Sequence, residues 1–269
     1  MTGSVRASFF AVIVSGLTVA VVCCAQDVDL DAPPARKSHP WARFRPGSWK
    51  KVSLITETFD ADGKLINTSV ARTRTTLSGV DDNGVTLKVE ATVDLAGKQV
   101  QSEPQVMLQG WHGETPERET TVTDLGEDSV TISGKRIPCH VEQAETTTAG
   151  GRIVTKTWLS ERVSPYVLRR ESTTYDRDND EIVSQTQVEV VALSRAIRLL
   201  RRHRQAAELR VVHTHPGGII RTTLLSSLEV PGGVVSHESE EFNADGRLAR
   251  RSKLQLVGFA GEFQPTTLR

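Results

Sequence analysis

The chain repeats part of itself, and this repeat limits the folds that it can adopt. Residues 148–176 match residues 215–243 without a gap, and residues 182–193 match residues 248–259 after a one-residue slip. A shorter echo relates residues 52–65 to residues 235–248. A single hairpin cannot bury its apolar face alone, so repeated strand–turn–strand units must join neighbours. The identical pairs of the longest match are Gly150/Gly217, Gly151/Gly218, Ile153/Ile220, Thr155/Thr222, Ser160/Ser227, Val163/Val230, Val167/Val234, Glu171/Glu238 and Ser172/Ser239.

Apolar and polar residues alternate through most of the chain after Trp49. Residues 87–95 (LKVEATVDL) show the pattern most clearly, and Asp-Gly or Asn-Gly turn signals separate such runs, as in DADG (60–63) and NADG (243–246). These are strand and hairpin signals. We therefore predict a mainly β fold: an antiparallel meander, open or curled into a half-barrel, with at most a little helix.

The first 25 residues have the pattern of an export signal. Arg6 precedes the uncharged run 7–22, which is shorter than a membrane-spanning helix requires. Cys23 and Ala25 occupy the −3 and −1 positions of a signal-peptidase site before Gln26. We expect a cleaved signal at residues 1–25 and export to the periplasm or extracellular space. Acylation at Cys23 or Cys24, which would make the protein a lipoprotein, and an uncleaved anchor are the alternatives.

Charge and cysteine content exclude some classes of protein. Lys plus Arg and Asp plus Glu both number 33, and this balance argues against a nucleic-acid partner. Two of the three cysteines fall in the predicted signal, so Cys139 has no partner for an internal disulfide. Cys139 shares one side of the alternating pattern with Ile137 and Val141, and we predict that it is a small core residue.

The composition predicts a simple order of segments. The predicted basic segment could be a solvated connection whose arginines keep a sheet edge soluble, or a patch that touches anionic lipid headgroups or envelope polymer. Membrane contact is therefore expected through the N-terminus or through residues 195–210. The predicted segments are a flexible tether (26–46), a β-rich domain (47–193), a basic linker or helix (194–210), a repeated β unit that extends or packs on the first (211–260) and a tail (261–269).

The sequence contains few candidates for chemistry. His213 and His215 have metal-ligand spacing without a third ligand, so an exposed hairpin end is the alternative. The acidic runs 176–180 and 27–31 lack the glycine and glutamate that an EF-hand loop needs. Residues 48–51 fit S-x-x-K without the partner motifs. We predict no catalytic, cofactor-binding or metal-binding residue, and expect the tryptophans to anchor the core or a sheet face.

One stretch is similar to a known family. Residues 130–172 combine a strand that ends in a Gly turn, a strand with alternating charges and a Trp/Tyr-containing strand (VTISGKRIPCHVEQAE…RIVTKTWLSERVSPYVLRRES). This stretch resembles exported bacterial proteins of the LolA/LppX type. The resemblance implies a half-barrel around an apolar groove closed by helices, in a protein that carries lipid or acyl chains.

Two classes of function follow from these observations. We expect an exported envelope protein that binds a hydrophobic ligand or lipid in a curved antiparallel sheet, without catalysis. The alternative is a structural or interaction module that meets another envelope protein. An enzyme ranks third, because a site assembled from scattered residues leaves no motif.

Overall fold

The computed structural model describes residues 38–95, 97–111, 120–148 and 150–263. Its named elements are all strands, which form one open antiparallel sheet in the order β4-β3-β2-β1-β14-β13-β12-β11-β10-β9-β8-β7-β6, with β5 also pairing with β3. The mainly β meander is therefore confirmed. The strands are β1 (Trp49–Phe59), β2 (Leu65–Asp81), β3 (Gly84–Leu95), β4 (Lys98–Gln101), β5 (Gln105–Gln109), β6 (Thr120–Ile132), β7 (Lys135–Thr148), β8 (Gly151–Leu159), β9 (Val167–Asp176), β10 (Ile182–Leu199), β11 (Arg202–His215), β12 (Gly218–Ser226), β13 (Val234–Asn243) and β14 (Leu248–Ala260).

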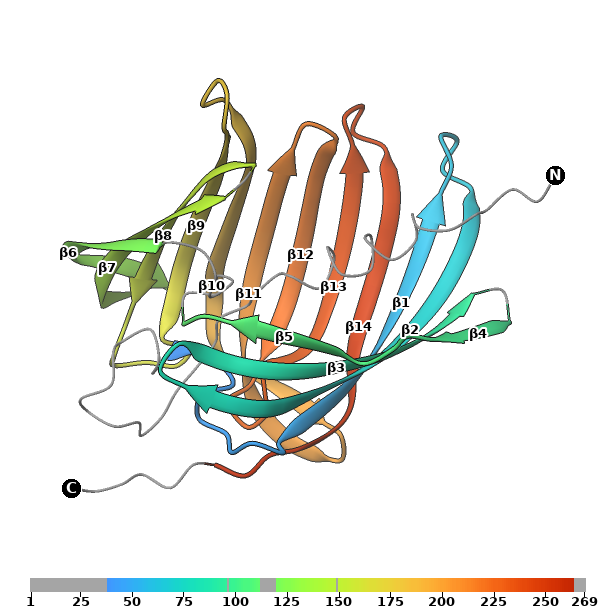
Figure 1. The fold of residues 1–269 in the computed structure, drawn as a ribbon, viewed down its shortest axis with the longest axis horizontal. Helices are drawn as coiled ribbons and strands as arrows, with labels where there is room; N and C mark the ends of the chain where they lie inside the picture. Colours follow the sequence, from blue (N-terminus) through green and yellow to red (C-terminus); the bar gives the residue numbers. More distant parts are fainter. Residues whose placement is uncertain (1–37, 96, 112–119, 149, 264–269) are drawn as a thin grey trace.

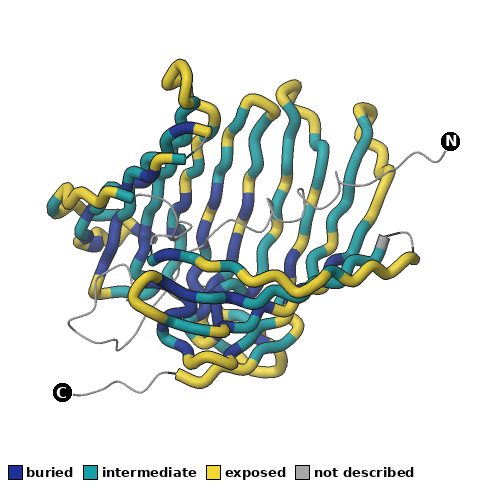
Figure 2. The backbone as a smooth tube through the Cα atoms, in the orientation of Figure 1, coloured by how far each residue is buried: buried dark blue, intermediate teal, exposed yellow. Residues whose placement is uncertain are grey.

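The long central strands form a curved wall, and β3 and β5 curl across its lower part (Figure 1). Most buried residues lie in this lower part, whereas the hairpin tips at the other end are exposed (Figure 2). Val190, Leu209 and Leu224 belong to one packed cluster, and each is at most 4% exposed. Because these residues come from β10, β11 and β12, their packing holds these three strands together.

The internal repeat is structural, as the sequence predicts. β8-β9-β10 and β12-β13-β14 are equivalent, since Gly151 pairs with Asp176 and Gly218 pairs with Asn243 in the same register. The hydroxyl pairs are also equivalent: Thr155 and Ser172 are 2.9 Å apart, and Thr222 donates to Ser239 at 2.8 Å.

The shorter echo is confirmed by its turn. Asp60 accepts hydrogen bonds from the backbone N–H groups of Asp62 and Lys64 at 3.0 and 2.9 Å. Asn243 accepts the equivalent bonds from Asp245 and Arg247 at 3.1 and 2.9 Å. The β1–β2 and β13–β14 hairpins therefore share one turn geometry, which the short polar side chain at the first position closes.

The prediction of a basic linker or helix at residues 194–210 is wrong. β10 continues to Leu199 and β11 begins at Arg202, so this segment is the end of a β-hairpin. Cross-strand pairing buries Ala207 and Leu209 to 5% and 1% exposure, and this burial outweighs the local helix propensity. The segment lies within the sheet and does not separate two units.

Two further boundaries change. Part of the predicted tether (26–46) is packed, because Trp41 and Phe44 are 4% and 0% exposed; residues 26–37 lie outside the described residues. The start of the predicted tail (261–269) is also held, since Phe44 and Phe263 stack at 5.1 Å. β1 pairs with β14, so residues 211–260 extend the sheet of residues 47–193, the first of the two expected arrangements. The predicted signal, residues 1–25, lies outside the described residues.

Candidate functional site

The β10–β11 hairpin ends in a two-residue turn that projects from the lower end of the sheet. Leu199 pairs with Arg202, which leaves Leu200 and Arg201 as the turn. Leu200 has a φ of 55°, in the left-handed region that a bulky residue rarely adopts, and it is 48% exposed. The turn therefore presents an apolar side chain to its surroundings.

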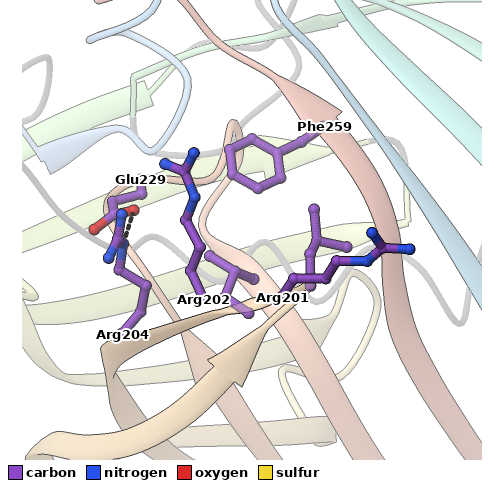
Figure 3. A pocket seen from close by; sticks show the side chains of 7 residues that line it. Arg201, Arg202, Arg204, Glu229 and Phe259 are labelled. Carbon is purple, nitrogen blue, oxygen red and sulfur yellow. Dashed lines mark hydrogen bonds and ion pairs between the residues drawn. The ribbon is translucent and has the colours of Figure 1, made fainter.

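An open pocket of about 510 Å³ lies beneath this hairpin. Its size falls within the range of small-molecule sites, roughly 300–1,000 Å³. Leu199 and Phe259 provide an apolar floor that continues into a cluster with Val230 and Val235. In Figure 3, Arg202 extends toward the space between Glu229 and the ring of Phe259. The lining residues are Leu199, Leu200, Arg201, Arg202, Arg204, Glu229 and Phe259.

The pocket carries an excess of positive charge. Arg204 donates through Nε to Glu229 at 2.7 Å, so this pair is neutral overall. Arg201 and Arg202 are exposed and form no ion pair with any residue that the structure describes. Two guanidinium groups therefore remain available beside an apolar floor.

Lys50 fixes the strand behind this floor. It is the cross-strand neighbour of Phe259, and its amine donates to the carbonyl of Gly232 at 3.3 Å. The amine also lies 5.5 Å from the centre of the Trp41 ring. Burial lowers the pKa of Lys50 to about 8. Lys50 therefore links β1 to the β12–β13 loop, which carries Glu229.

Part of the curved sheet carries a packed cluster, whereas the resemblance to the LolA/LppX type implies an apolar groove. Leu168, Val190 and Leu209 are 0%, 4% and 1% exposed and pack in one cluster, which Val163 and Leu228 from the adjoining loops extend. These residues fill space rather than line it. The β10–β11 hairpin places an exposed apolar residue, Leu200, beside exposed arginines.

The two histidines of the predicted metal spacing stack on each other. Their ring centroids are 5.4 Å apart, and His213 Nδ1 lies 2.8 Å from the hydroxyl of Thr186. Burial lowers the pKa of His213, and the charge of His215 adds to this effect. Within the described ranges, no group of three or more metal-ligating side chains is placed to hold a metal ion.

The remaining sequence candidates have structural roles. Asp176 accepts the backbone N–H of Asp178 at 2.8 Å, and Asp180 pairs with Arg152 at 2.9 Å, so the acidic run closes a turn. Ser48 is buried, and its hydroxyl accepts the N–H of Glu262 at 3.2 Å. The acidic run 27–31 lies outside the described residues.

Two predictions about core residues are confirmed. Cys139 is 2% exposed within the main cluster, and burial raises the pKa of its thiol. Trp158 is 4% exposed and belongs to the same cluster.

Sequence reasoning identified the arginines of the hairpin but not the rest of the pocket. Phe259 and Glu229 come from β14 and from the β12–β13 loop, far from the hairpin in sequence. Their only signal is the repeat, which places both in the second copy. Pairing of the copies in one sheet brings them beneath the hairpin.

No helix in the described part of the chain is long and apolar enough to cross a membrane.

Comparisons with known proteins give remote matches. No family model and no curated protein matches the chain. One solved structure, from Bacteroides fragilis, is of a protein described as exported with a YmcC-like fold; it shares 12% identity, covers 81% of this chain and 97% of its own, and has a TM-score of 0.30. Another, from Parabacteroides distasonis, is of a protein described as a lipoprotein. It shares 9% identity, covers 78% of this chain and 95% of its own, and has a TM-score of 0.31. At these TM-scores the likeness carries no conclusion about function.

Proposed function

We propose that this protein is an exported envelope protein that binds an anionic amphiphile in the pocket beneath the β10–β11 hairpin. The observation that carries the proposal is the juxtaposition of an apolar floor, Leu199 and Phe259, with the guanidinium groups of Arg201 and Arg202, which form no ion pair within the described ranges. Such a pocket matches a molecule that has both a hydrocarbon part and an acidic head.

The chemistry of the lining favours binding at both ends of such a ligand. Guanidinium groups bind carboxylate or phosphate through paired hydrogen bonds, which makes arginine more selective than a point charge. The Phe259 ring and the Leu199 side chain offer contact for a hydrocarbon chain. The lining contains no hydroxyl, thiol or imidazole group, so the proposed role is binding without catalysis.

Export is the second part of the proposal and comes from the sequence of residues 1–25. The uncharged run 7–22 followed by Cys23 and Ala25 fits a signal that is removed before Gln26. Mass spectrometry of the protein from its native envelope tests this. A mature chain beginning at Gln26 supports cleavage, a diacylated Cys23 or Cys24 supports the lipoprotein form, and an intact N-terminus in the cytoplasm contradicts export.

Binding is tested with a dansyl-labelled undecanoate and its uncharged methyl ester. We expect the purified protein to bind the acid about tenfold more tightly than the ester, the ratio that one charge-assisted contact provides. Arg202→Gln should remove most of this preference, whereas Phe259→Ala should weaken the acid and the ester alike. Circular dichroism melts confirm that both variants are folded.

Arg72→Gln is the matched control, because Arg72 is exposed on β2, away from the pocket. It should bind both probes like the wild type. Equal affinity for acid and ester in the wild type, or the same affinity in all variants, would contradict the proposal.

A second candidate function is an interaction module, and exposed apolar residues at one edge of the sheet favour it. β4 and β5 both pair with β3, and Val100, Val106 and Leu108 on them are 54%, 70% and 49% exposed. An unpaired edge can accept a strand of another chain. A second copy is the simplest occupant. Sedimentation velocity should then show a dimer that Val106→Asp dissociates, and a monomer at all concentrations would exclude it.

A further inference from the structure

We propose that the tip of the β10–β11 hairpin docks on an anionic lipid membrane, with Leu200 entering the interface and the surrounding arginines contacting the headgroups. The proposed contact joins the hairpin tip to a surface and does not require a ligand in the pocket, although Leu200, Arg201 and Arg202 also line that pocket.

Leu200 is the first line of evidence. A leucine with a φ of 55° is strained, and glycine would fit this turn position better. The side chain is nevertheless 48% exposed, so core packing does not account for it. An apolar side chain at the outermost position of a hairpin is suited to insertion into the boundary between headgroups and acyl chains.

The arginines around Leu200 are the second line of evidence. Arg198, Arg201 and Arg202 are exposed and form no ion pair among the residues described here. Arg198 faces His203 across the hairpin, and Arg202 faces Leu199, so the charges lie on both faces of the tip. Long cationic side chains on both sides of an apolar tip can reach headgroups while the tip enters the interface.

The charge distribution along β10 is the third line of evidence. The turn at the far end of β10 carries four acids, Asp176, Asp178, Asp180 and Glu181, against Arg177 and the paired Arg152. The two turns lie at opposite ends of the same strand (Figure 1). An anionic surface therefore attracts the tip and repels the other end, which orients the protein with the hairpin toward the membrane.

These three features favour a membrane over a soluble polyanion. A polyanion would use the arginines but would gain nothing from Leu200. A membrane uses both, because its interface combines anionic headgroups with hydrocarbon. Leu200→Gly therefore separates the two partners, and it also relieves the strain at this turn position.

The test is co-sedimentation of the purified protein with phosphatidylcholine vesicles that contain or lack phosphatidylglycerol. The wild type should bind the anionic vesicles and release them at high salt. Arg198→Gln should reduce partitioning about fivefold, which corresponds to the contribution expected of one arginine near an anionic surface. Leu200→Gly should reduce partitioning more than Arg198→Gln does, while its melting temperature should equal or exceed that of the wild type. Arg72→Gln should bind like the wild type.

Control measurements distinguish this inference from the pocket proposal. Arg198 does not line the pocket, so Arg198→Gln should bind dansyl-undecanoate normally. Phe259→Ala should bind vesicles normally. If Arg198→Gln and Leu200→Gly bind anionic vesicles as well as the wild type, the docking inference is overturned. Equal binding of polyphosphate and vesicles, both insensitive to Leu200→Gly, would also overturn it in favour of a soluble polyanion.

Discussion

The indole N–H of Trp158 donates a hydrogen bond of 2.9 Å to a carboxylate oxygen of Asp128. Trp158 lies on β8 and Asp128 on β6, the last strand of the sheet, so this bond spans the intervening strand β7. The bond is the main reason that the pKa of Asp128 is lowered, and the backbone N–H of Ser129 adds to it. It ties the edge strand to the main cluster.

This bond predicts a pH-dependent contribution to stability from Asp128. A carboxylate with a lowered folded-state pKa stabilises the fold above its unfolded value of 3.8, and this contribution is lost as the pH falls through the folded value. Asp128→Ala should lower the urea midpoint at neutral pH. The difference from the wild type should disappear well below pH 3.8. A difference that persists in acid would show that packing, not the charge, is involved.

His237 should cause a second pH effect on stability, at a higher pH than that of Asp128. It lies between Leu224 and Leu254 in the ladder, and burial lowers its pKa from 6.5 to about 4. The folded state holds it neutral, so stability is present above pH 6.5 and is lost as the pH falls from 6.5 toward 4.

The full effect of His237 is about 3 kcal/mol, by the conversion of 1.36 kcal/mol for each pKa unit. Urea unfolding of His237→Leu should therefore show a weaker loss of stability over this range. Some loss remains, because burial also lowers the pKa of His39 to about 4. An unchanged pH profile in His237→Leu would contradict the prediction.

Position 218, at the start of β12, should accept no residue other than glycine without a large loss of stability. Its φ is 143°, and a Cβ there would lie 1.9 Å from the carbonyl oxygen of Phe242. Gly218→Ala should cost roughly 3 kcal/mol or more in unfolding free energy. Gly246→Ala is the control: its φ is 77° with open space around it, and it should cost only about 1–2 kcal/mol. Equal effects of the two changes would show that the close approach to Phe242 is absent.

The repeat and its turns could be predicted because they depend on local chemistry. Asp60 and Asn243 each close a turn with their own neighbours, and the glycines at positions 63 and 246 share a φ of 77°. Short side chains that bond the backbone two residues on, followed by glycine, specify such a turn without help from distant residues.

The β10–β11 hairpin could not be predicted correctly from the sequence, because bulges interrupt the alternation of apolar and polar residues. The register shifts between Val190 and Ala192 and again between Ala192 and Arg195. Each shift changes the face on which the following residues lie, so the alternation of period two is lost there. The arginine- and alanine-rich segment then resembles a helix by propensity alone. Pairing between β10 and β11 decides the structure.

The pocket could be predicted only in part, since its residues come from distant elements. Arg201 and Arg202 stand out as a local excess of charge. Phe259 and Glu229 do not, because each is an ordinary residue in its own segment. They meet the hairpin through the register of the whole sheet, which no short stretch of sequence determines.

Leu254 marks the buried face of β14, and we expect this face to tolerate no charge. It is 4% exposed and lies between Leu54 and His237, whereas Gln255 is exposed on the opposite face. Leu254→Asp should cost roughly 3–5 kcal/mol or abolish folding, because it removes a buried side chain and buries a charge. Gln255→Asp should change the unfolding free energy by less than about 0.5 kcal/mol. Urea unfolding measures both, and equal tolerance would show that the face assignment is mistaken.

The neighbouring Lys253 refines this prediction. Its amine donates to Glu238 at 2.6 Å on the exposed face. Lys253→Asp therefore replaces an attraction with a repulsion, but exposed pairs contribute only about 0.2–1 kcal/mol. The protein should stay folded in the same urea titration. Loss of folding would place this pair at a more critical position than its exposure indicates.

Replacement of Glu229 by glutamine should strengthen the binding of an anionic ligand. Glu229 accepts a 2.7 Å hydrogen bond from Arg204 and neutralises one of the three arginines of the pocket. Glu229→Gln keeps the side-chain volume but removes the negative charge, so Arg204 becomes available to an anionic ligand. The affinity for dansyl-undecanoate should rise about three- to tenfold, while the affinity for its methyl ester should stay constant. Arg204→Gln should reverse the gain in the double variant. If Glu229→Gln weakens binding of the acid, Glu229 itself positions the ligand, and the role assigned to the arginines is wrong.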